Sequence, residues 1–459
     1  MRMEYIGLNE INGPLVVLDG VTGVSYEEMA EITLPGGKTR AGRVIMIEGD
    51  RVVVQVFEGT SGLSLENAYT RFTGRPMELP LSRDMLGRVF DGGGRPIDRL
   101  GPLFAEEKRD INGSAINPVS RKYPRACIHT GISAIDGMAT LIRGQKLPIF
   151  SGAGLCHSEL AAQIARQAHV TGDDNEEFAI VFAAMGVKND TADFFRRDFE
   201  ESGALQRVVM FLNLASDPII ERILTPRCAL TAAEYLAFTH GYHVLVILTD
   251  ITSYCEALRE FSSSKGEIPS RKGYPSYLYS DLASLYERAG MLLDRPGSVT
   301  QAPILTMPND DITHPIPDLT GYITEGQIVL DRQLDQGGLY PPIAVLPSLS
   351  RLMKDGIGKG YTRDDHPTLA NQLFSSYARV QEARALASVI GEDELSDTDK
   401  KYMEFGRQFE KNFVSQGMTE NRTMDQTLEI GWRALSALPR EELDRVDAVL
   451  LAKYYKDRV

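Results

Sequence analysis

The chain has 459 residues, 43% hydrophobic and 24% charged, which is ordinary for a globular protein of roughly two to four domains. Its formal net charge of −14 argues against a nucleic-acid-binding groove, because such a groove normally needs a basic surface. Four cysteines without C-x-x-C spacing indicate a reducing compartment, and seven scattered histidines predict no metal site built from protein ligands alone. No signal peptide or long apolar span is recognisable, so we expect membrane association only through partners.

The first 75 residues have the pattern of a small β-barrel. Residues 43–47 and 51–57 are short runs rich in β-branched side chains, and Glu48-Gly49-Asp50 between them is a turn signal. Short strands at this spacing predict a barrel over residues 1–75.

Residues 76–355 alternate apolar runs with helical patterns. The runs 178–183, 207–212 and 243–248 are largely apolar, as is typical of parallel strands that are buried on both faces. Residues 228–240 between two of them have a helical pattern. We therefore predict an α/β core with a parallel sheet, whose ligands bind at the carboxyl ends of the strands.

The composition changes near residue 355. Residues 378–390, 397–414 and 424–438 carry helical periodicity and few β-branched side chains. We predict that residues 356–459 form an all-helical domain.

A strand–loop–helix segment in the centre of the core resembles a P-loop, G-x-x-x-x-G-K-[ST], that has lost its key residues. It consists of Ser151, Gly152, Ala153, Gly154, Leu155, Cys156, His157 and Ser158. When the loop is aligned on the hydroxyl of Ser158, Ser151 and Cys156 replace the two glycines, and His157 replaces the lysine. That lysine puts a fixed positive charge on the β- and γ-phosphates, whereas histidine is shorter and mostly neutral near pH 7. The sequence therefore predicts that this chain does not hydrolyse nucleotide.

Two interpretations of the degenerate loop stay open. Gly152 and Gly154 still allow backbone N–H groups to approach a phosphate at the N-terminus of the next helix, which would give a weak, non-catalytic nucleotide site. Alternatively, the loop only connects a strand to a helix and binds nothing.

The other elements of a hydrolytic site are only partly present. Val187 stands where a carboxylate should orient water, and the nearby Asp190 is expected to be a solvated turn residue. Asp250 follows the run 243–248 and is either a magnesium-binding carboxylate or the cap of the next helix, and we favour the cap.

Several segments together resemble the rotary ATPase family, most closely the non-catalytic B subunits of V-type and archaeal-type complexes. The matching segments, which extend over essentially the whole chain, are residues 56–63, 84–92, 130–136, 143–148, 273–290 and 318–327. The resemblance implies a RecA-like P-loop NTPase core between an N-terminal β-barrel and a C-terminal helical domain. It also implies that His157 and Val187 stand in place of the lysine and the glutamate of the catalytic subunits.

Residues 341–351 resemble a family segment that ends in an arginine finger, although Ala344 stands where the family usually has a polar residue. By this resemblance Arg351 reaches across a subunit interface to the γ-phosphate held by a catalytic neighbour. The plainer alternative is an arginine in an interface salt bridge. Tyr322 and Tyr340 are candidates for lining an interface, but we expect both to pack in the core.

The resemblance implies a hexameric head in which three copies of this chain alternate with three catalytic A subunits around a central rotor stalk, with a peripheral stalk alongside. ATP or ADP with Mg would bind at the interface with the catalytic subunit, and this chain alone would bind none tightly. The head would lie on the cytoplasmic face of the cell membrane and couple to proton or sodium transport through a separate membrane sector.

Three rival functions stay open at this point. The first is an autonomous P-loop ATPase of a related family, which His157 and Val187 argue against. The second is a ring helicase, which the net charge of −14 argues against. The third is a ring scaffold that has no role in nucleotide binding, which the sequence does not exclude.

Overall fold

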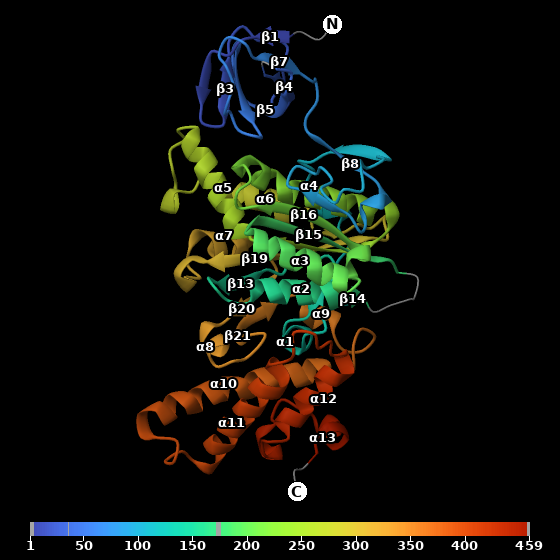
Figure 1. The fold of residues 1–459 in the computed structure, drawn as a ribbon. Coiled ribbons are helices and arrows are strands. Elements are labelled where there is room, and N and C mark those ends of the chain that lie inside the picture. The colour runs from blue at the N-terminus through green and yellow to red at the C-terminus, as the bar shows by residue number, and fades with distance from the viewer. Residues whose placement is uncertain (1–3, 35, 171–175, 457–459) are drawn as a thin grey trace.

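The computed structural model describes residues 4–34, 36–170 and 176–456, which form three parts stacked end to end (Figure 1). A β-barrel lies at the N-terminal end, an α/β core lies in the middle, and a helical bundle lies at the C-terminal end. The predicted fold class is confirmed. The exact limits at residues 75 and 355 stay predictions.

The N-terminal part is a seven-stranded antiparallel sheet with the strand order β1-β7-β4-β5-β6-β3-β2. Its strands are β1 (Glu4–Ile6), β2 (Glu10–Asn12), β3 (Leu15–Leu18), β4 (Met29–Thr33), β5 (Thr39–Glu48), β6 (Arg51–Val56) and β7 (Tyr69–Phe72). Ile32, Val44 and Val54 are fully buried, because alternate side chains of each strand point to the inside. The predicted runs 43–47 and 51–57 correspond to β5 and β6.

The core is built on a large mixed sheet with the order β21-β20-β13-β19-β17-β15-β16-β9, in which β18 also pairs with β19. All neighbours are parallel except β20 with β21 and β18 with β19. The strands are β9 (Val89–Asp91), β13 (Ile149–Gly152), β15 (Phe178–Val187), β16 (Val208–Leu214), β17 (His243–Thr249), β18 (Gly290–Met291), β19 (Ser298–Met307), β20 (Gly326–Leu330) and β21 (Ile343–Ser350). The three predicted apolar runs are β15, β16 and β17.

Helices cover both faces of this sheet. Alternate residues of β15 belong to different hydrophobic cores: Phe182 packs with Phe195 and Phe199, while Val181 lies in the core on the other side with Leu236. The helices of this part are α1 (Ser133–Met138), α2 (His157–Gln167), α3 (Asn189–Glu201), α4 (Ile219–His240), α5 (Ile251–Ser264), α6 (Leu278–Tyr286), α7 (Pro315–Ile323), α8 (Arg332–Gln336) and α9 (Met353–Gly356). The burial of β15 on both sides explains why its sequence is continuously apolar.

Two small sheets extend this framework. The strands β8 (Glu78–Leu81) and β10 (Glu107–Asp110) form an antiparallel pair, and β14 (His169–Val170) joins β11 (Cys127–His129) and β12 (Leu141–Ile142).

The C-terminal part consists of the helices α10 (His366–Ile390), α11 (Asp397–Gln408), α12 (Met424–Leu435) and α13 (Ala448–Tyr454). A π-helical turn over Phe409–Val414 follows α11. The helix α10 starts earlier than predicted, because Pro367 lies in its first turn, where proline is compatible with a helix.

Hydrogen bonds to backbone carbonyls join the helical part to the core. The Gln163 side chain, on α2, donates to the carbonyls of Gly417 and Glu420, at 3.1 Å each, and Arg166 of the same helix donates to the carbonyl of Met418. The helix α2 thus connects the degenerate loop directly to the segment before α12.

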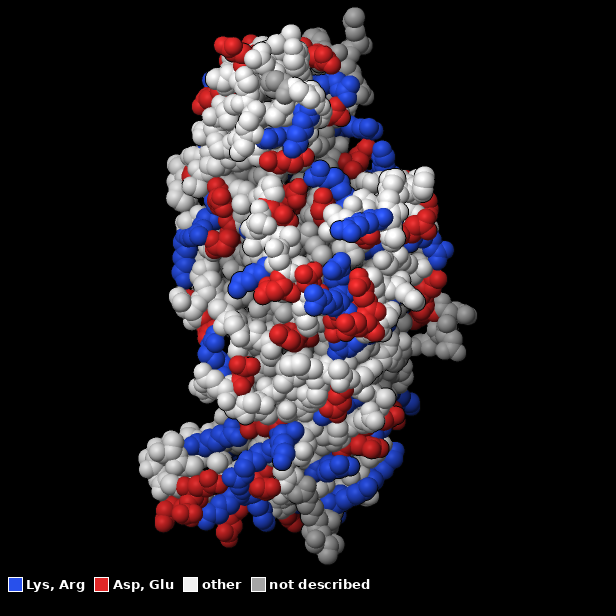
Figure 2. Space-filling view, viewed as in Figure 1, with Lys and Arg blue, Asp and Glu red and all other residues white. Residues whose placement is uncertain are grey.

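The visible face carries mixed charge. Figure 2 shows Lys and Arg side chains interspersed with Asp and Glu, with acidic groups gathered over the middle part. In the described ranges, no helix has both the length and the apolar character that crossing a bilayer requires, and no group of three or more His, Cys, Asp or Glu is arranged to hold a metal ion.

The single tryptophan of the chain reports on the packing of the helical part. Trp432 Nε1 donates to Asp365 Oδ2 at 2.6 Å, and Arg363 donates to both oxygens of the same fully buried carboxylate, at 2.6 and 2.9 Å. Burial acts to raise the pKa of Asp365, but the hydrogen bonds from Arg363 and Trp432 lower it overall.

We expect Asp365→Ala to lower the free energy of unfolding of the helical part by about 3 kcal/mol, because Arg363 and Trp432 lose a buried acceptor. This contribution should be present above the unfolded carboxyl pKa of about 3.9 and lost as the pH falls through the lower folded pKa. Denaturant titration followed by the fluorescence of Trp432 measures both effects. The exposed neighbour Asp364→Ala is the control, and equal losses from both variants would contradict the prediction.

Candidate functional site: a degenerate phosphate loop and a free arginine

The degenerate loop lies in the predicted strand–loop–helix setting. It begins in the last two residues of β13 and leads into α2, which begins at His157, so Ser158 is the second residue of the helix. Ala153 and Gly154 are exposed at the tip, and Gly154 has a positive φ of 81° with open space around it. Backbone access to a phosphate is therefore preserved at the tip of the loop.

The two ends of the loop close on each other. Ser151 Oγ and His157 Nδ1 lie 3.2 Å apart, in hydrogen-bond contact. The His157 N–H donates to the carbonyl of Leu155 at 2.9 Å, and the Leu155 N–H donates to that of Gly152 at 3.2 Å. Side chains and N–H groups that a P-loop directs at phosphate are thus engaged within the loop.

An ion pair lies against the loop from outside. Arg332 donates to both oxygens of Asp310, at 2.7 and 2.9 Å, and also to the carbonyl of Ala153 at 2.9 Å. A Cβ atom on Gly152 would lie 2.1 Å from Asp310 Oδ1, so only glycine permits this approach. The hydrogen bonds from Arg332 lower the pKa of Asp310, which keeps a negative charge beside the loop. We call this pair the 310–332 clasp.

Asp250 caps a helix, as predicted. Its Oδ1 accepts from the Thr252 N–H at 2.8 Å at the start of α5, and from the Thr306 N–H at 3.1 Å on β19. Burial raises the pKa of this carboxyl group. The same oxygen therefore ties two strands and a helix together at the end of β17.

No carboxylate occupies position 187, where a hydrolytic site would need one to orient water. Val187 ends β15, and Asp190 lies exposed in the first turn of α3, where it accepts from the Thr191 N–H at 2.8 Å. Asp190 is thus solvated, as expected, but it lies in the helix itself and not in a turn before it.

Arg351 follows the last residue of β21 and is exposed. Its N–H donates to the carbonyl of Glu325 at 2.9 Å. Over residues 4–34, 36–170 and 176–456, its guanidinium has neither a hydrogen-bond partner nor an ion-pair partner. A guanidinium can therefore be offered from this edge to a ligand or to another chain.

The two candidate tyrosines differ. The Tyr322 side chain on α7 is 74% exposed, so the expectation that it packs in the core was wrong, because it lies on the outer side of an amphipathic helix. Tyr340 is partly buried and donates to Gln163 Oε1 on α2 at 2.8 Å. Only Tyr340 is part of the packing around the degenerate loop.

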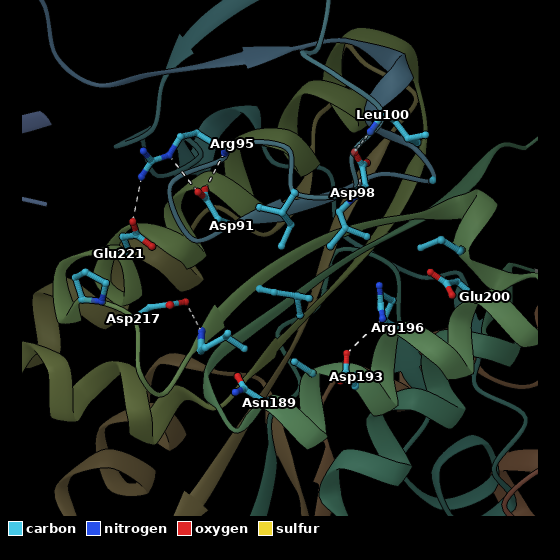
Figure 3. A pocket seen from close by; sticks show the side chains of 18 of the residues that line it. Asp91, Arg95, Asp98, Leu100, Asn189, Asp193, Arg196, Glu200, Asp217 and Glu221 are labelled. Atoms are coloured by element: carbon cyan, nitrogen blue, oxygen red, sulfur yellow. Dashed lines mark hydrogen bonds and ion pairs between the residues drawn. The ribbon is translucent and has the colours of Figure 1, made fainter. Parts of the chain in front are cut away.

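A separate cavity of about 1000 Å³ lies at the β9 edge of the sheet, between that strand and α3 (Figure 3). Its charged lining residues are Glu58, Asp91, Asp98, Asp193, Glu200, Asp217, Glu221, Arg95 and Arg196. Arg95 contacts Asp91 and Glu221, and burial together with the Asp91 carboxylate raises the pKa of Glu221 to about 7. Seven carboxyl groups against two guanidinium groups disfavour phosphate, so this cavity is no substitute for the loop. It was not anticipated from the sequence.

Comparison with protein families and relatives identifies the class of this fold and loop. Family models described as the ATP synthase alpha/beta family match residues 9–74 (beta-barrel domain) and 131–350 (nucleotide-binding domain), and the C-terminal domain of V and A type ATP synthase matches residues 355–455. The chain belongs to the ATP synthase alpha/beta family.

Within that family it is similar over its full length to chains named V-type ATP synthase beta chain, the B-subunit branch that the motifs indicated. The protein from Halothermothrix orenii is 65% identical over 459 residues, covering 100% of this chain and 99% of the relative. Beta chain 2 of Clostridium tetani is 63% identical over 457 residues and covers 99% of both chains. A solved structure of the ATP synthase subunit NeqB from Nanoarcheaum equitans has a TM-score of 0.73 and 41% identity, and covers 93% of this chain and 100% of that one.

The 310–332 clasp predicts the behaviour of the loop toward nucleotide. Asp310→Ala removes a carboxylate beside the loop and releases the Arg332 cation toward a bound phosphate. We expect the affinity of the isolated chain for MgATP to rise about tenfold, which corresponds to ~1.4 kcal/mol. Equilibrium dialysis or titration with a fluorescent ATP analogue measures this affinity.

Asp311→Ala is the matched control, because that side chain contacts Lys272 and Thr313 instead of the loop. An unchanged affinity in Asp310→Ala, or an equal rise in both variants, would show that the clasp does not oppose nucleotide binding.

Proposed function

We propose that this chain is the non-catalytic, regulatory B subunit of a V/A-type rotary ATPase or ATP synthase. In this proposal three copies alternate with three catalytic A subunits in a hexameric head. Each copy supplies Arg351 in trans to the ATP site of the neighbouring catalytic subunit. The head couples ATP hydrolysis or synthesis to proton or sodium transport.

The observation that carries the proposal is the position of Arg351 relative to the chain's own loop. The strand β13 runs parallel to β20, with Ile149 opposite Ile328, and its carboxyl end leads into the loop. The strand β21 runs antiparallel to β20, with Ser350 opposite Gly326. Arg351 therefore lies level with Lys146, beside the amino ends of β13 and β20, whereas Gly152 lies at the carboxyl end of β13.

The six residue steps from Lys146 to Gly152 correspond to about 20 Å at ~3.3 Å per residue. A single arginine side chain does not bridge that distance. Arg351 cannot complete the phosphate loop of its own chain, which supports a role at the loop of another subunit.

The chemistry of Arg351 suits that role. An exposed guanidinium that is free of partners in the described structure is always charged, and it can contact two phosphate oxygens at once. In phosphoryl transfer, an arginine supplied in trans contributes roughly 10³–10⁵ in rate.

The state of the chain's own loop supports the non-catalytic part of the proposal. His157 is engaged by Ser151, no carboxylate stands at Val187, and Asp250 is used as a cap. ATP or ADP with Mg would therefore be held mainly by the catalytic neighbour, with Gly152, Ala153 and Gly154 offering only weak phosphate contacts on this chain.

The remaining partners follow from the same proposal. The helical part would contact a central rotor stalk, and a peripheral stalk would hold the head on the cytoplasmic face of the membrane. Closure at the interface would reach the helical part through α2, whose Gln163 contacts residues 417 and 420. No nucleic acid takes part.

The decisive experiment compares ATP hydrolysis by the head reassembled with its catalytic subunit, using the native chain and Arg351→Ala at equal hexamer content. We expect kcat to fall by roughly 10²-fold or more, because the transition-state charge on the γ-phosphate loses a cation. Steady-state turnover with size-exclusion analysis of assembly measures both quantities.

Lys354→Ala serves as the control, because Lys354 is an exposed cation three residues further along the chain. Near-normal turnover with Arg351→Ala would refute the finger and leave the chain as a scaffold. Turnover by the purified chain alone would refute the non-catalytic role.

A further inference from the structure

Hydrogen bonds from buried polar side chains hold the backbone that carries Arg351. Ser350 Oγ donates to the carbonyl of Thr140 at 2.8 Å and accepts from Gln145 Nε2 at 2.9 Å. The same Gln145 nitrogen lies 3.2 Å from the Glu325 carbonyl, which also accepts the Arg351 N–H. Gln145 is fully buried, so these contacts are shielded from water.

A buried lysine next in sequence fixes Glu325 itself. Lys146 is only 4% exposed, and its Nζ lies 2.8 Å from Glu325 Oε1 and 2.9 Å from Glu287 Oε1. Its N–H donates to Glu325 Oε2 at 2.8 Å, and its carbonyl accepts the Glu325 N–H at 3.1 Å. Three contacts therefore join these two residues, and they involve both the backbone and the side chain of each.

Glycine at position 326 makes this arrangement possible. Gly326 has a φ of +137°, and a Cβ atom there would lie 1.9 Å from the Leu349 carbonyl oxygen. The residue after Glu325 thus packs directly against the strand that ends at Arg351. A displacement of Glu325 would therefore also displace that strand, because no space separates the two backbones.

We propose that Lys146 and Glu325 are positioning residues for Arg351, which fix the direction in which its guanidinium leaves this edge of the sheet. The inference rests on the proposed finger and adds two residues to it. Lys146 holds the Glu325 carboxylate, and the Glu325 carbonyl holds the Arg351 N–H.

The physical need for such support follows from the exposure of Arg351. A long, exposed side chain without partners has many rotamers, and ordering it costs free energy at the moment of reaction. A rigid backbone limits the set of positions that the guanidinium samples. A misplacement of about 1 Å can reduce turnover by roughly 10²-fold.

The test is the turnover of the reassembled head with Glu325→Ala, Glu325→Asp and the control Glu287→Ala. Glu325→Asp keeps a negative charge opposite Lys146 but shortens the side chain by one methylene. Because the charge balance is preserved, this variant can still be tested if Glu325→Ala fails to assemble. Glu287→Ala removes the other carboxylate that is paired with Lys146. Within the described residues, Glu287 has no hydrogen bond with the Arg351 backbone, whereas the carbonyl of Glu325 accepts the Arg351 N–H.

We expect both Glu325 variants to lower kcat by roughly 10-fold or more, with the KM for ATP and the hexamer content unchanged. Glu287→Ala should leave kcat within about twofold, even if it lowers thermal stability. In the Arg351→Ala background, Glu325→Ala should cause no further loss of kcat, because a positioning residue acts only through the side chain that it positions.

The outcomes separate the two proposals. If Arg351→Ala abolishes turnover while the Glu325 variants that assemble turn over normally, the positioning role is refuted and the finger stands. Equal losses from Glu325→Ala and Glu287→Ala, or an additive loss in the Arg351→Ala background, also refute positioning and indicate a general effect on the fold. If Arg351→Ala itself is near normal, the proposed finger is refuted and the positioning role with it.

Discussion

The directions of three neighbouring strands decide what this chain can do with its polar residues. Because β13 and β20 are parallel and β21 is antiparallel to them, the phosphate loop lies at the carboxyl end of β13, whereas Arg351 lies beside the amino ends of β13 and β20. Backbone hydrogen bonding makes this separation permanent, since a strand cannot reverse within a sheet without losing its ladder. The arrangement supports the proposed ring, in which the two ends of the strands would face two different neighbours.

The arginines at the two ends of the strands differ in their partners. At the loop edge, Arg332 is neutralised by Asp310 and lies against the Ala153 carbonyl. At the other end of the strands, the guanidinium of Arg351 is exposed, while the buried Lys146 is paired with the partly exposed Glu325. An interior ion pair is costly to desolvate and is tolerated where its geometry is good and its hydrogen bonds are complete. Here the buried partner is Lys146, which lies level with Arg351 along the sheet.

Local sequence patterns predicted much of the fold. The strands β15, β16 and β17 were found because burial on both faces imposes continuous apolar runs, and the loop was placed correctly because its flanking strand and helix have strong local patterns. The start of α4 was placed too late, at residue 228 instead of Ile219, because Pro226 lies within the helix and proline normally marks a helix boundary in a sequence. The cap role of Asp250 was favoured over magnesium binding because the lysine and the water-orienting carboxylate of a hydrolytic site were already missing from the sequence.

Features that depend on long-range register were not accessible in this way. Nothing near residue 351 in sequence indicates that β21 is antiparallel, and the contact of Asp310 with Gly152 joins segments more than a hundred residues apart. The roles of Lys146 and Glu325 are hidden for the same reason. The exposure of Tyr322 depends on which side of α7 meets the core, which a nine-residue helix leaves undetermined.

The contacts between α2 and the helical part have a consequence for sequence variation. Gln163 and Arg166 donate to the carbonyls of Gly417, Met418 and Glu420, and carbonyl groups are present whatever the side chains are. The side chains at positions 418 and 419 can therefore change among relatives without breaking this connection, whereas Glu420 also accepts from the Gly417 N–H and from Arg422 and so keeps the path of the backbone. Divergence at positions 418 and 419 should therefore change this connection little, whereas a change at Gln163 removes both of its donated hydrogen bonds.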